Sequence, residues 1–358
     1  MPSLKEIKGR INSISSTLAI TSAMKMVASA KLQKAQMAIQ NMLPYERRLY
    51  SMLLDLMGAM NISAAASEDG SVRGSGSAER GFDQSGDRLS LSNRHDLAGM
   101  DGAYSLMAQR EVRKVAIVAF ASNSSLCGAF NSNAIREATA VINEYRASGL
   151  GDADITVYSV GRKMAEAMKK LGFPSPADFT KMSDSPSYEA ASALAQELLD
   201  GFVSGRFDKV ELVYNHYKST SSQPTTRQTY LPLSLADATA DIQVGKITDS
   251  ASESDTNRGA EPVGAPVVRQ GSPTTEDLIV EPSKEELIAT LLPKVVRLRV
   301  FTTLLDSTAA EHAARTVAMQ LATDNGNDLL QELTLEYNKG RQQKITSEIL
   351  DLVGGSMQ

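Results

Sequence analysis

Apolar residues recur near the start of the chain at spacings that alternate between three and four positions. The series holds for about six heptads, and among its apolar and small residues only Thr21 and Lys25 stand out. A pattern of this length predicts a coiled-coil seam rather than the amphipathic helix of a globular domain. Ile20, Met24 and Val27 lie off the seam and give the helix a second apolar surface. The seam positions are 4, 7, 11, 14, 18, 21, 25, 28, 32, 35, 39 and 42.

A second heptad pattern occupies the end of the chain. Unbroken from residue 293 to residue 353, its helix would be roughly 90 Å long at 1.5 Å per residue. However, residues 283–286 fit a capping box that opens a short helix before Pro293 begins the longer one, and Asn325-Gly326 is typical of a turn. Two such helices at opposite ends of the chain are best explained as one antiparallel pair. The repeat comprises Leu291, Leu298, Leu305, His312, Met319, Gly326, Leu333 and Gly340, and the stripe ends with Ile345, Ile349 and Leu352.

Strands and helices alternate in the middle of the chain. Strands separated by helices of 10–15 residues predict a small, mostly parallel, Rossmann-like α/β domain inserted between the two coiled-coil arms. We expect strands at 113–120, 155–160, 209–217 and 225–233, with helices at 133–147, 162–172 and 187–205.

Two polar segments flank this domain. Residues 61–100 hold eight Ser and six Gly, and residues 245–275 are rich in Gly, Pro and Ser, so both are expected to be flexible insertions. The predicted organisation is an N-terminal arm at 1–60, an insertion at 61–110, an α/β domain at 111–244, a polar insertion at 245–282 and a C-terminal arm at 283–358.

Composition narrows what can surround the apolar N-terminal helix. The formal net charge of −5 argues against a general nucleic-acid binder, and one cysteine, Cys127, excludes an internal disulfide and a Cys-based zinc site. So few thiols favour a cytosolic or cytosol-facing chain. The apolar runs are too short to span a bilayer, and the helical pattern begins by residue 4, leaving no room for a transit peptide. Protein is therefore expected to enclose this helix.

Three segments carry a family resemblance. The stretches "LKEIKGRINSISSTLAITSAMKMVASAKLQKAQ" (4–36) and "EHAARTVAMQLATDNGNDLLQELTLEYNKGRQQKITSEILDLVGGS" (311–356) resemble the two terminal signatures of the gamma-subunit family of F-type ATP synthases. "SLCGAFN" (125–131) is similar to the short motif after the first strand of that family's α/β domain. The resemblance covers both arms densely and the middle domain sparsely.

The resemblance implies a non-catalytic rotor shaft. In this family the two arms form an antiparallel coiled coil inside a ring of three alpha and three beta subunits. The α/β domain lies below the ring and, with the epsilon subunit, grips the ring of c subunits, so that torque passes between proton flow and nucleotide chemistry on beta. It implies no cofactor and no metal, membrane contact only through the complex, and a place at the cytoplasmic face of the bacterial inner membrane.

The resemblance also implies where partners touch the shaft. Met24 and Lys25 align with the contact to acidic beta loops, and residues 1–50 hold eight Lys or Arg against two Asp or Glu. Ala19 and Ser22 stand where relatives often carry Lys, which weakens this electrostatic attraction. The polar catch on the C-terminal arm corresponds to Arg341, Gln342, Thr346 and Glu348. The internal seam corresponds to Ile7, Ile11, Ile14 and Leu18.

Simpler interpretations remain beside these. Lys25 is also compatible with a surface lysine lying along apolar neighbours, Met24 with a core residue and Arg341 with a helix C-terminal cation. His312 is expected to be packed rather than to bind a ligand, and Cys127 to be structural because no base stands near it in sequence. The alternative functions are a non-rotary coiled-coil adaptor with a ligand-binding α/β domain and, more remotely, an enzyme that acts through Cys127.

Overall fold

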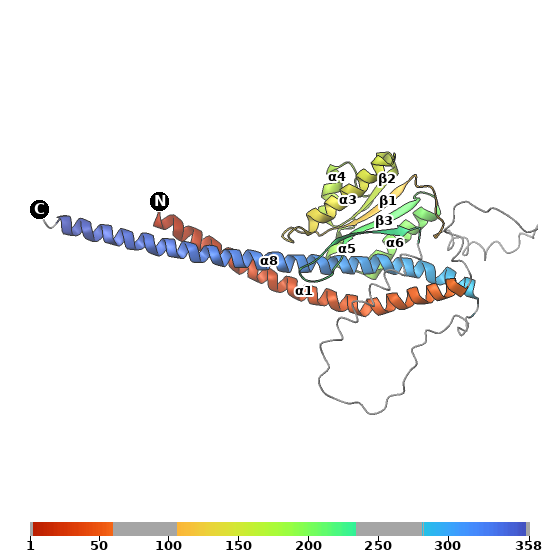
Figure 1. The fold of residues 1–358 in the computed structure, drawn as a ribbon, viewed down its shortest axis with the longest axis horizontal. Coiled ribbons are helices and arrows are strands. Elements are labelled where there is room, and N and C mark those ends of the chain that lie inside the picture. Colours follow the sequence, from red (N-terminus) through yellow and green to blue (C-terminus); the bar gives the residue numbers. More distant parts are fainter. Residues whose placement is uncertain (1–2, 60–105, 234–280, 282, 356–358) are drawn as a thin grey trace, which may run out of the picture.

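Two long helices from opposite ends of the chain form a rod, and an α/β domain lies on one flank of it (Figure 1). The computed structural model describes residues 3–59, 106–233, 281 and 283–355. Both predicted insertions lie outside the described residues, apart from 106–110 and 281. The first helix, α1, spans Leu4–Ala59, and the last, α8, spans Lys284–Gly355. They run antiparallel, since Leu4 meets Gly340 and Leu18 meets Gly326.

Both helices pass through residues that were expected to interrupt them. Helix α8 is continuous through Pro293 and through Asn325-Gly326, so the prediction of two helices separated at Pro293 is wrong. Proline inside a helix costs about 3 kcal/mol, whereas burying one Val or Leu contributes about 1.5–3 kcal/mol. Leu292, Val295 and Val296 are all fully buried, so packing outweighs the local preference. The predicted cap at Ser283 is present, because its hydroxyl accepts a hydrogen bond from the Glu286 backbone N–H at 3.1 Å.

Helix α1 is likewise continuous through Pro44, a residue type that commonly kinks or ends a helix. The turns that follow the proline carry Leu49, Tyr50 and Leu53, which are buried in the largest apolar cluster of the molecule. Continuing the helix is therefore favoured, since ending it would expose these three side chains.

The central sheet has four strands in the order β2-β1-β3-β4. Strands β1, β2 and β3 are parallel, with Val115 of β1 opposite Ile155 of β2 and Lys209 of β3. Strand β4 is antiparallel to β3. All four predicted strands are present and the mostly parallel sheet is confirmed. Their bounds are Val115–Phe120 for β1, Ile155–Val160 for β2, Lys209–Asn215 for β3 and Thr225–Leu231 for β4.

The helices of the α/β domain follow the predicted ranges closely. Helix α3 spans Phe130–Ala147, α4 spans Arg162–Lys170 and α6 spans Tyr188–Val203. Two elements escaped prediction, the short helix α5 at Thr180–Asp184 and a 3-10 turn at Asp152–Asp154. Neither is long enough to show a helical period in the sequence.

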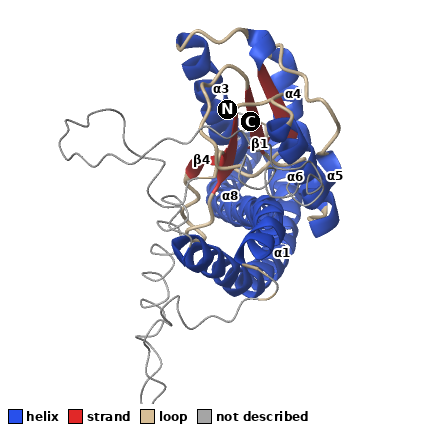
Figure 2. Ribbon diagram, turned by 90° about the vertical axis from the view of Figure 1, so that its right-hand side faces the viewer, coloured by secondary structure: helices blue, strands red, loops and turns tan. Residues whose placement is uncertain are grey.

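Alternate residues of β1 serve two separate cores. Val115, Ile117 and Ala119 pack on the side of α3 and α4. Ala116, Val118 and Phe120 face the opposite way, into a core shared with α6 and with both shaft helices. Both faces of the sheet are covered, which explains why β1 is an uninterrupted apolar run (Figure 2). The sheet is therefore joined to the shaft by a continuous hydrophobic core.

Candidate partner interface

The heptad positions of α1 and α8 meet along one face of each helix. Every one of the twelve expected positions on α1 is buried or half-buried, whereas most residues between them are exposed. The polar residue Thr21 has a partner on the seam, because its hydroxyl lies 3.0 Å from that of Thr323. The predicted seam residues Ile7, Ile11, Ile14, Leu18, Leu305, Met319 and Leu333 are all buried or half-buried.

Two glycines on α8 set how closely the helices approach. A Cβ atom added to Gly326 would lie 2.6 Å from a methyl carbon of Leu18, and one added to Gly340 would lie 3.1 Å from a methyl carbon of Leu4. Glycine inside a helix costs about 1 kcal/mol relative to alanine. The Asn325-Gly326 pair therefore marks a close helix contact, and the turn signal that it gives in the sequence is misleading.

The apolar surface beyond the seam is open around Met24. Ile20, Met24 and Val27 are spaced for one face of α1 and are 56%, 40% and 58% exposed. Lys25 is different, because it occupies a seam position and is half-buried. The structure thus leaves Met24 accessible to a partner and places much of Lys25 against its own shaft.

The last part of α8 extends beyond α1 as a single helix. Leu4 packs on Gly340, and every residue from 341 to 350 is exposed. The predicted polar catch lies on this extension: Thr346 donates its hydroxyl hydrogen to the Gln342 carbonyl at 2.9 Å, and Glu348 lies 3.8 Å from Lys344. The apolar stripe continues there without a partner helix, with Ile345, Ile349 and Leu352 at 47%, 55% and 75% exposure.

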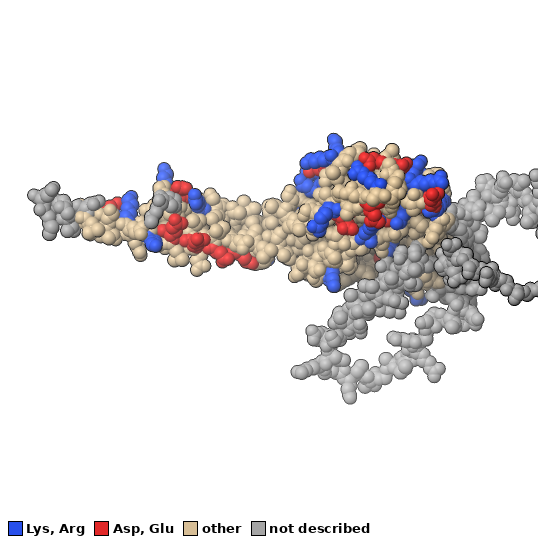
Figure 3. Space-filling model, turned by 45° about the horizontal axis from the view of Figure 1, so that its top comes forward, with Lys and Arg blue, Asp and Glu red and all other residues tan. Residues whose placement is uncertain are grey.

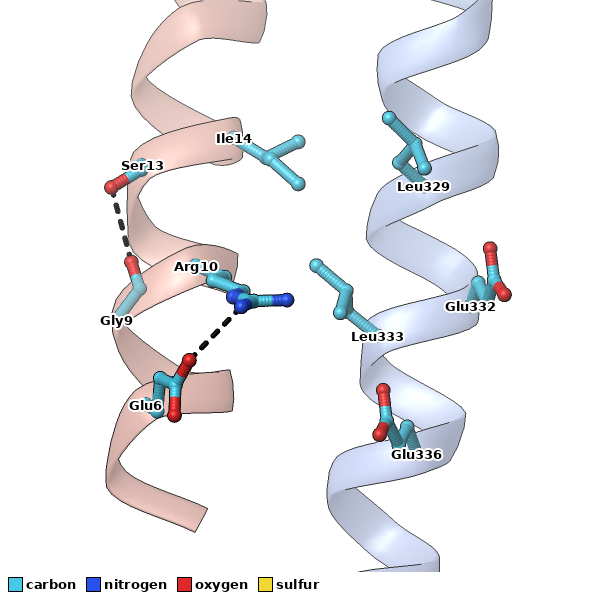
Figure 4. A pocket seen from close by; sticks show the side chains of 9 residues that line it. All are labelled: Glu6, Gly9, Arg10, Ser13, Ile14, Leu329, Glu332, Leu333 and Glu336. Carbon is cyan, nitrogen blue, oxygen red and sulfur yellow. Dashed lines mark hydrogen bonds and ion pairs between the residues drawn. The ribbon is translucent and has the colours of Figure 1, made fainter. Parts of the chain in front are cut away.

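A groove of about 720 Å³ lies between the two helices near the start of α1. In Figure 4, Ile14 and Leu333 point toward one another across it, and Glu6 pairs with Arg10 at 2.9 Å along its edge. Figure 3 shows acidic side chains in a row along this part of the shaft. Four exposed carboxylates recur at intervals of four residues on α8, at Asp324, Asp328, Glu332 and Glu336.

A buried polar group lies halfway along the shaft. Burial, with Arg315 and Lys31 nearby, lowers the pKa of His312 to about 4, so the imidazole is neutral at pH 7. Its Nδ1 atom is buried and has no hydrogen-bond partner among the described residues. Burial raises the pKa of Glu311 and is opposed by Arg315, whose guanidinium lies 2.7 Å from the carboxylate. His312 is packed, as the sequence predicted.

Cys127 is enclosed rather than presented to solvent. It is 1% exposed and packs with Phe130 and Ala310, and the Asn131 side-chain amide lies 3.1 Å from its sulfur. These contacts agree with a structural role. No local pattern indicates which side chains surround Cys127, because Ala310 is almost two hundred residues away in the chain.

The described residues contain no cluster of side chains arranged to hold a metal ion, and none of their helices is long and apolar enough to cross a membrane. What they do contain is a two-helix shaft with an α/β domain on its flank and a bare helical tip. This is the architecture of a stalk protein, whose function lies in its contacts with partners.

Comparisons with known proteins identify the kind of stalk. The chain matches the ATP synthase family over residues 3–357. It is 47% identical over 357 residues to the ATP synthase gamma chain of Phocaeicola vulgatus and 46% identical over 358 residues to that of Bacteroides thetaiotaomicron, with all of each chain covered. A chain of the mitochondrial ATP synthase of Euglena gracilis has a similar fold, with a TM-score of 0.52 at 19% identity, covering 99% of this chain and 93% of its own.

The chain therefore belongs to the ATP synthase gamma-chain family, whose members are the non-catalytic central stalk of the complex. This membership confirms the role expected from the two terminal segments.

Proposed function

We propose that this chain turns as the axle of a ring of three alpha and three beta subunits, one copy to each ring. The observation that carries the proposal is the free end of the shaft, where a two-helix rod with exposed apolar residues narrows to a single bare helix at Gly340. An apolar surface of this kind is costly to expose to water and is normally covered by protein. A ring around the shaft supplies that cover.

The chemistry of the exposed surface suits a contact that must be broken repeatedly. A buried ion pair or a bidentate hydrogen bond to the ring would cost several kcal/mol each time it was broken. Ile20, Met24 and Val27 offer non-directional contact instead, which changes little as the shaft turns. Met24 is the candidate for this contact with acidic loops of beta, and Lys25 adds positive charge beside it.

The polar residues of the α8 extension are the candidates for a transient catch. Arg341, Gln342, Thr346 and Glu348 are exposed and have no neighbouring helix. The Thr346 hydroxyl uses its hydrogen on the Gln342 carbonyl, which leaves its oxygen free to accept a hydrogen bond from a partner. Such bonds are weak enough to form and break at each step of rotation.

The asymmetry of the shaft is what would couple its rotation to the chemistry on the beta subunits. A single shaft meets three equivalent beta subunits with different faces, and its different contacts bias each subunit toward a different state. The α/β domain, together with epsilon, is proposed to hold the ring of c subunits, so that the shaft links proton flow to nucleotide chemistry. The complex would place the chain at the cytoplasmic face of the bacterial inner membrane, with no direct lipid contact of its own.

Reconstitution tests this proposal. The chain mixed with alpha and beta subunits should give a particle with the mass of three alpha, three beta and one stalk, and with ATPase activity that depends on the chain. A matched control ends the chain at Gly340 and so lacks the bare tip while keeping the seam; it should assemble with lower activity. Failure of the full chain to assemble, or a particle with two or more copies of it, would contradict the proposal.

A further inference from the structure

The carboxyl ends of the parallel strands face the shaft. In open α/β sheets this edge normally holds a ligand, in the crevice where neighbouring strands send their connections to opposite faces. Here the edge meets α8. Cys127 and Phe130, which follow β1, are buried against Ala310, and the Cα of Gly128 faces Ala318, whose methyl would lie 3.8 Å from an added Cβ. A helix of small residues occupies the place of a ligand.

The loop after β3 makes the first polar contact with α8. The carboxylate of Asp306 accepts a hydrogen bond from the Tyr217 backbone N–H at 2.9 Å, and its other oxygen lies 2.6 Å from Nδ1 of His216. The Asp306 side chain is only 18% exposed, so water competes weakly for these bonds. One carboxylate on the shaft thus holds two consecutive residues of the loop.

The same loop also reaches α1. The phenol oxygen of Tyr217 accepts a hydrogen bond from the Gln36 side-chain amide at 2.5 Å. The Tyr217 ring packs against a cluster formed by Leu32 and Ala35 of α1 with Ala309 and Ala313 of α8. Tyr217 therefore contacts both helices of the shaft, on either side of their seam.

The loop after β1 makes a third contact, closer to the free end of the shaft. The Ser124 hydroxyl accepts a hydrogen bond from the Arg315 guanidinium at 2.7 Å. This loop is held in shape from within, because the Ser122 hydroxyl donates to the Ser124 carbonyl at 2.6 Å and Leu126 is fixed at a φ of +68°. A loop fixed in this way can transmit force without first deforming.

We propose that these contacts form a torsional latch that fixes the angle of the α/β domain on the shaft. The latch consists of Gln36, Ser124, His216, Tyr217, Asp306 and Arg315. Elsewhere the domain meets α8 residues 288–304 through apolar packing and through hydrogen bonds from Arg297 to Gln196 and from Tyr230 to the Val296 carbonyl. Closer to the free end, Cys127 and Phe130 meet Ala310 through apolar packing alone, which has little directional preference. Hydrogen bonds are directional, so the latch opposes twisting of the domain about the shaft.

The position of the latch has a mechanical consequence, which rests on the function proposed above. Torque that enters the shaft at Arg315 leaves 40 residues of α8 free to twist before Gly355, whereas torque that enters at Leu304 leaves 51. The twist of a uniform rod under a given torque grows with its free length, and each residue adds the same 1.5 Å. Loss of the latch should therefore increase the angular variance of the domain about 1.3-fold, since the free length grows from about 60 Å to about 77 Å.

The test measures that variance in a working particle. The ring is fixed to a surface, a gold rod is attached to α4 through Lys169→Cys in a Cys127→Ser background, and angular fluctuations are recorded while the rotor waits for ATP. The latch variant combines Tyr217→Phe, Asp306→Ala and Ser124→Ala, and the matched control, Arg146→Ala, removes an ion pair to Asp152 that lies wholly within the domain.

The latch variant is expected to show an angular variance raised about 1.3-fold or more, fewer protons pumped per ATP under an opposing gradient, and unloaded ATPase activity like that of the parent. Asp306→Asn, which keeps an acceptor for the Tyr217 N–H, should recover part of the stiffness. An unchanged variance in rotating particles would overturn the latch and leave the axle intact, whereas a parent particle that never rotates would overturn the proposed function itself. If the triple variant does not assemble, Tyr217→Phe alone decides the matter. It keeps the packed ring, and the only hydrogen bond to the shaft that it removes is the one from Gln36; the other contact of the hydroxyl, with Thr220, lies within the loop.

Discussion

The two halves of α8 follow one heptad phase but are stabilised in different ways. In residues 288–319 most side chains are buried or half-buried, because the sheet, α6 and α1 all pack around them. In residues 321–350 only the seam positions are shielded, and from 341 to 350 every residue is exposed. The docked half is part of a domain core, while the free half depends on a narrow seam and is open to partners. A continuous helix can thus serve as an anchor at one end and a contact surface at the other.

The largest effect on stability is expected from a substitution in the docked half. Leu304 is 2% exposed, and Leu304→Ala should lower the free energy of unfolding by about 2–5 kcal/mol because it removes buried methyl groups and leaves a cavity. Leu335 in the free half is 66% exposed, so Leu335→Ala should change it by less than about 0.5 kcal/mol. Urea denaturation of the two variants measures the contrast. Similar losses in both would show that the halves are not stabilised differently.

The seam of the free half is sensitive to the size of one residue. Gly326→Ala should destabilise the chain by roughly 1 kcal/mol, because the clash with Leu18 outweighs the better helix propensity of alanine. Gly9 has open space where its Cβ would stand, so Gly9→Ala is the matched control and should stabilise by about 0.5–1 kcal/mol. Combining Gly326→Ala with Leu18→Ala should show a favourable coupling energy in a double-mutant cycle. Additive effects would mean that the helices do not approach each other at this point.

Acid should weaken the docked half of α8 through His312. Its pKa is about 4 in the folded chain against an ordinary value near 6.5, so the unfolded chain takes up the proton first. Stability is therefore fully present above pH 6.5 and is lost as the pH falls toward 4, by on the order of 1 kcal/mol once solvent screening is allowed for.

His312→Gln separates this effect from the other titrating groups. Glu311 works in the opposite direction, because its raised pKa favours the folded chain in acid, and it stays in place in the variant. Thermal melts between pH 7 and pH 4.5 should show a shallower loss for His312→Gln than for the parent chain. If the melting temperatures of the two chains fell in parallel with pH, His312 would be excluded as the cause of the acid sensitivity.

The smallest effect on stability, with a clear effect on function, is expected at the bare tip. Gln342→Ala combined with Thr346→Ala removes exposed polar groups that have no neighbouring helix. The free energy of unfolding should therefore change by less than about 0.5 kcal/mol. ATP turnover or coupled synthesis should nevertheless fall in the assembled particle. Glu332→Gln, also exposed but beside the groove rather than on the tip, is the control. Unchanged coupled synthesis in the double variant would remove these two positions from the proposed catch.

Local periodicity predicted most of the fold. The α1 seam and all four strands follow from spacings of seven and from buried-type runs, which are properties of short stretches. The continuity of α8 could not be read in this way, because Pro293 and Gly326 each signal an interruption that is overridden by residues far away in sequence. Glycine at 326 is explained only once Leu18 is known to stand opposite it.

The sequence suggested candidate contact residues but did not indicate which of them are exposed. A heptad stripe does not reveal where the partner helix ends, so the bare tip beyond Gly340 became apparent only from the packing of Leu4. Lys25 is half-buried on the seam, and the sequence alone did not indicate how much of its side chain stays accessible to a partner. The contacts of Asp306 with His216 and Tyr217 join segments about ninety residues apart, and no local pattern marks them.

Rotation itself is the most direct test of the axle. With the ring of alpha and beta subunits fixed to a surface and a gold rod attached to the α/β domain, ATP should drive the domain in one direction with three stops per turn, one for each beta subunit. A particle that hydrolyses ATP at full rate while the domain stands still would contradict the account.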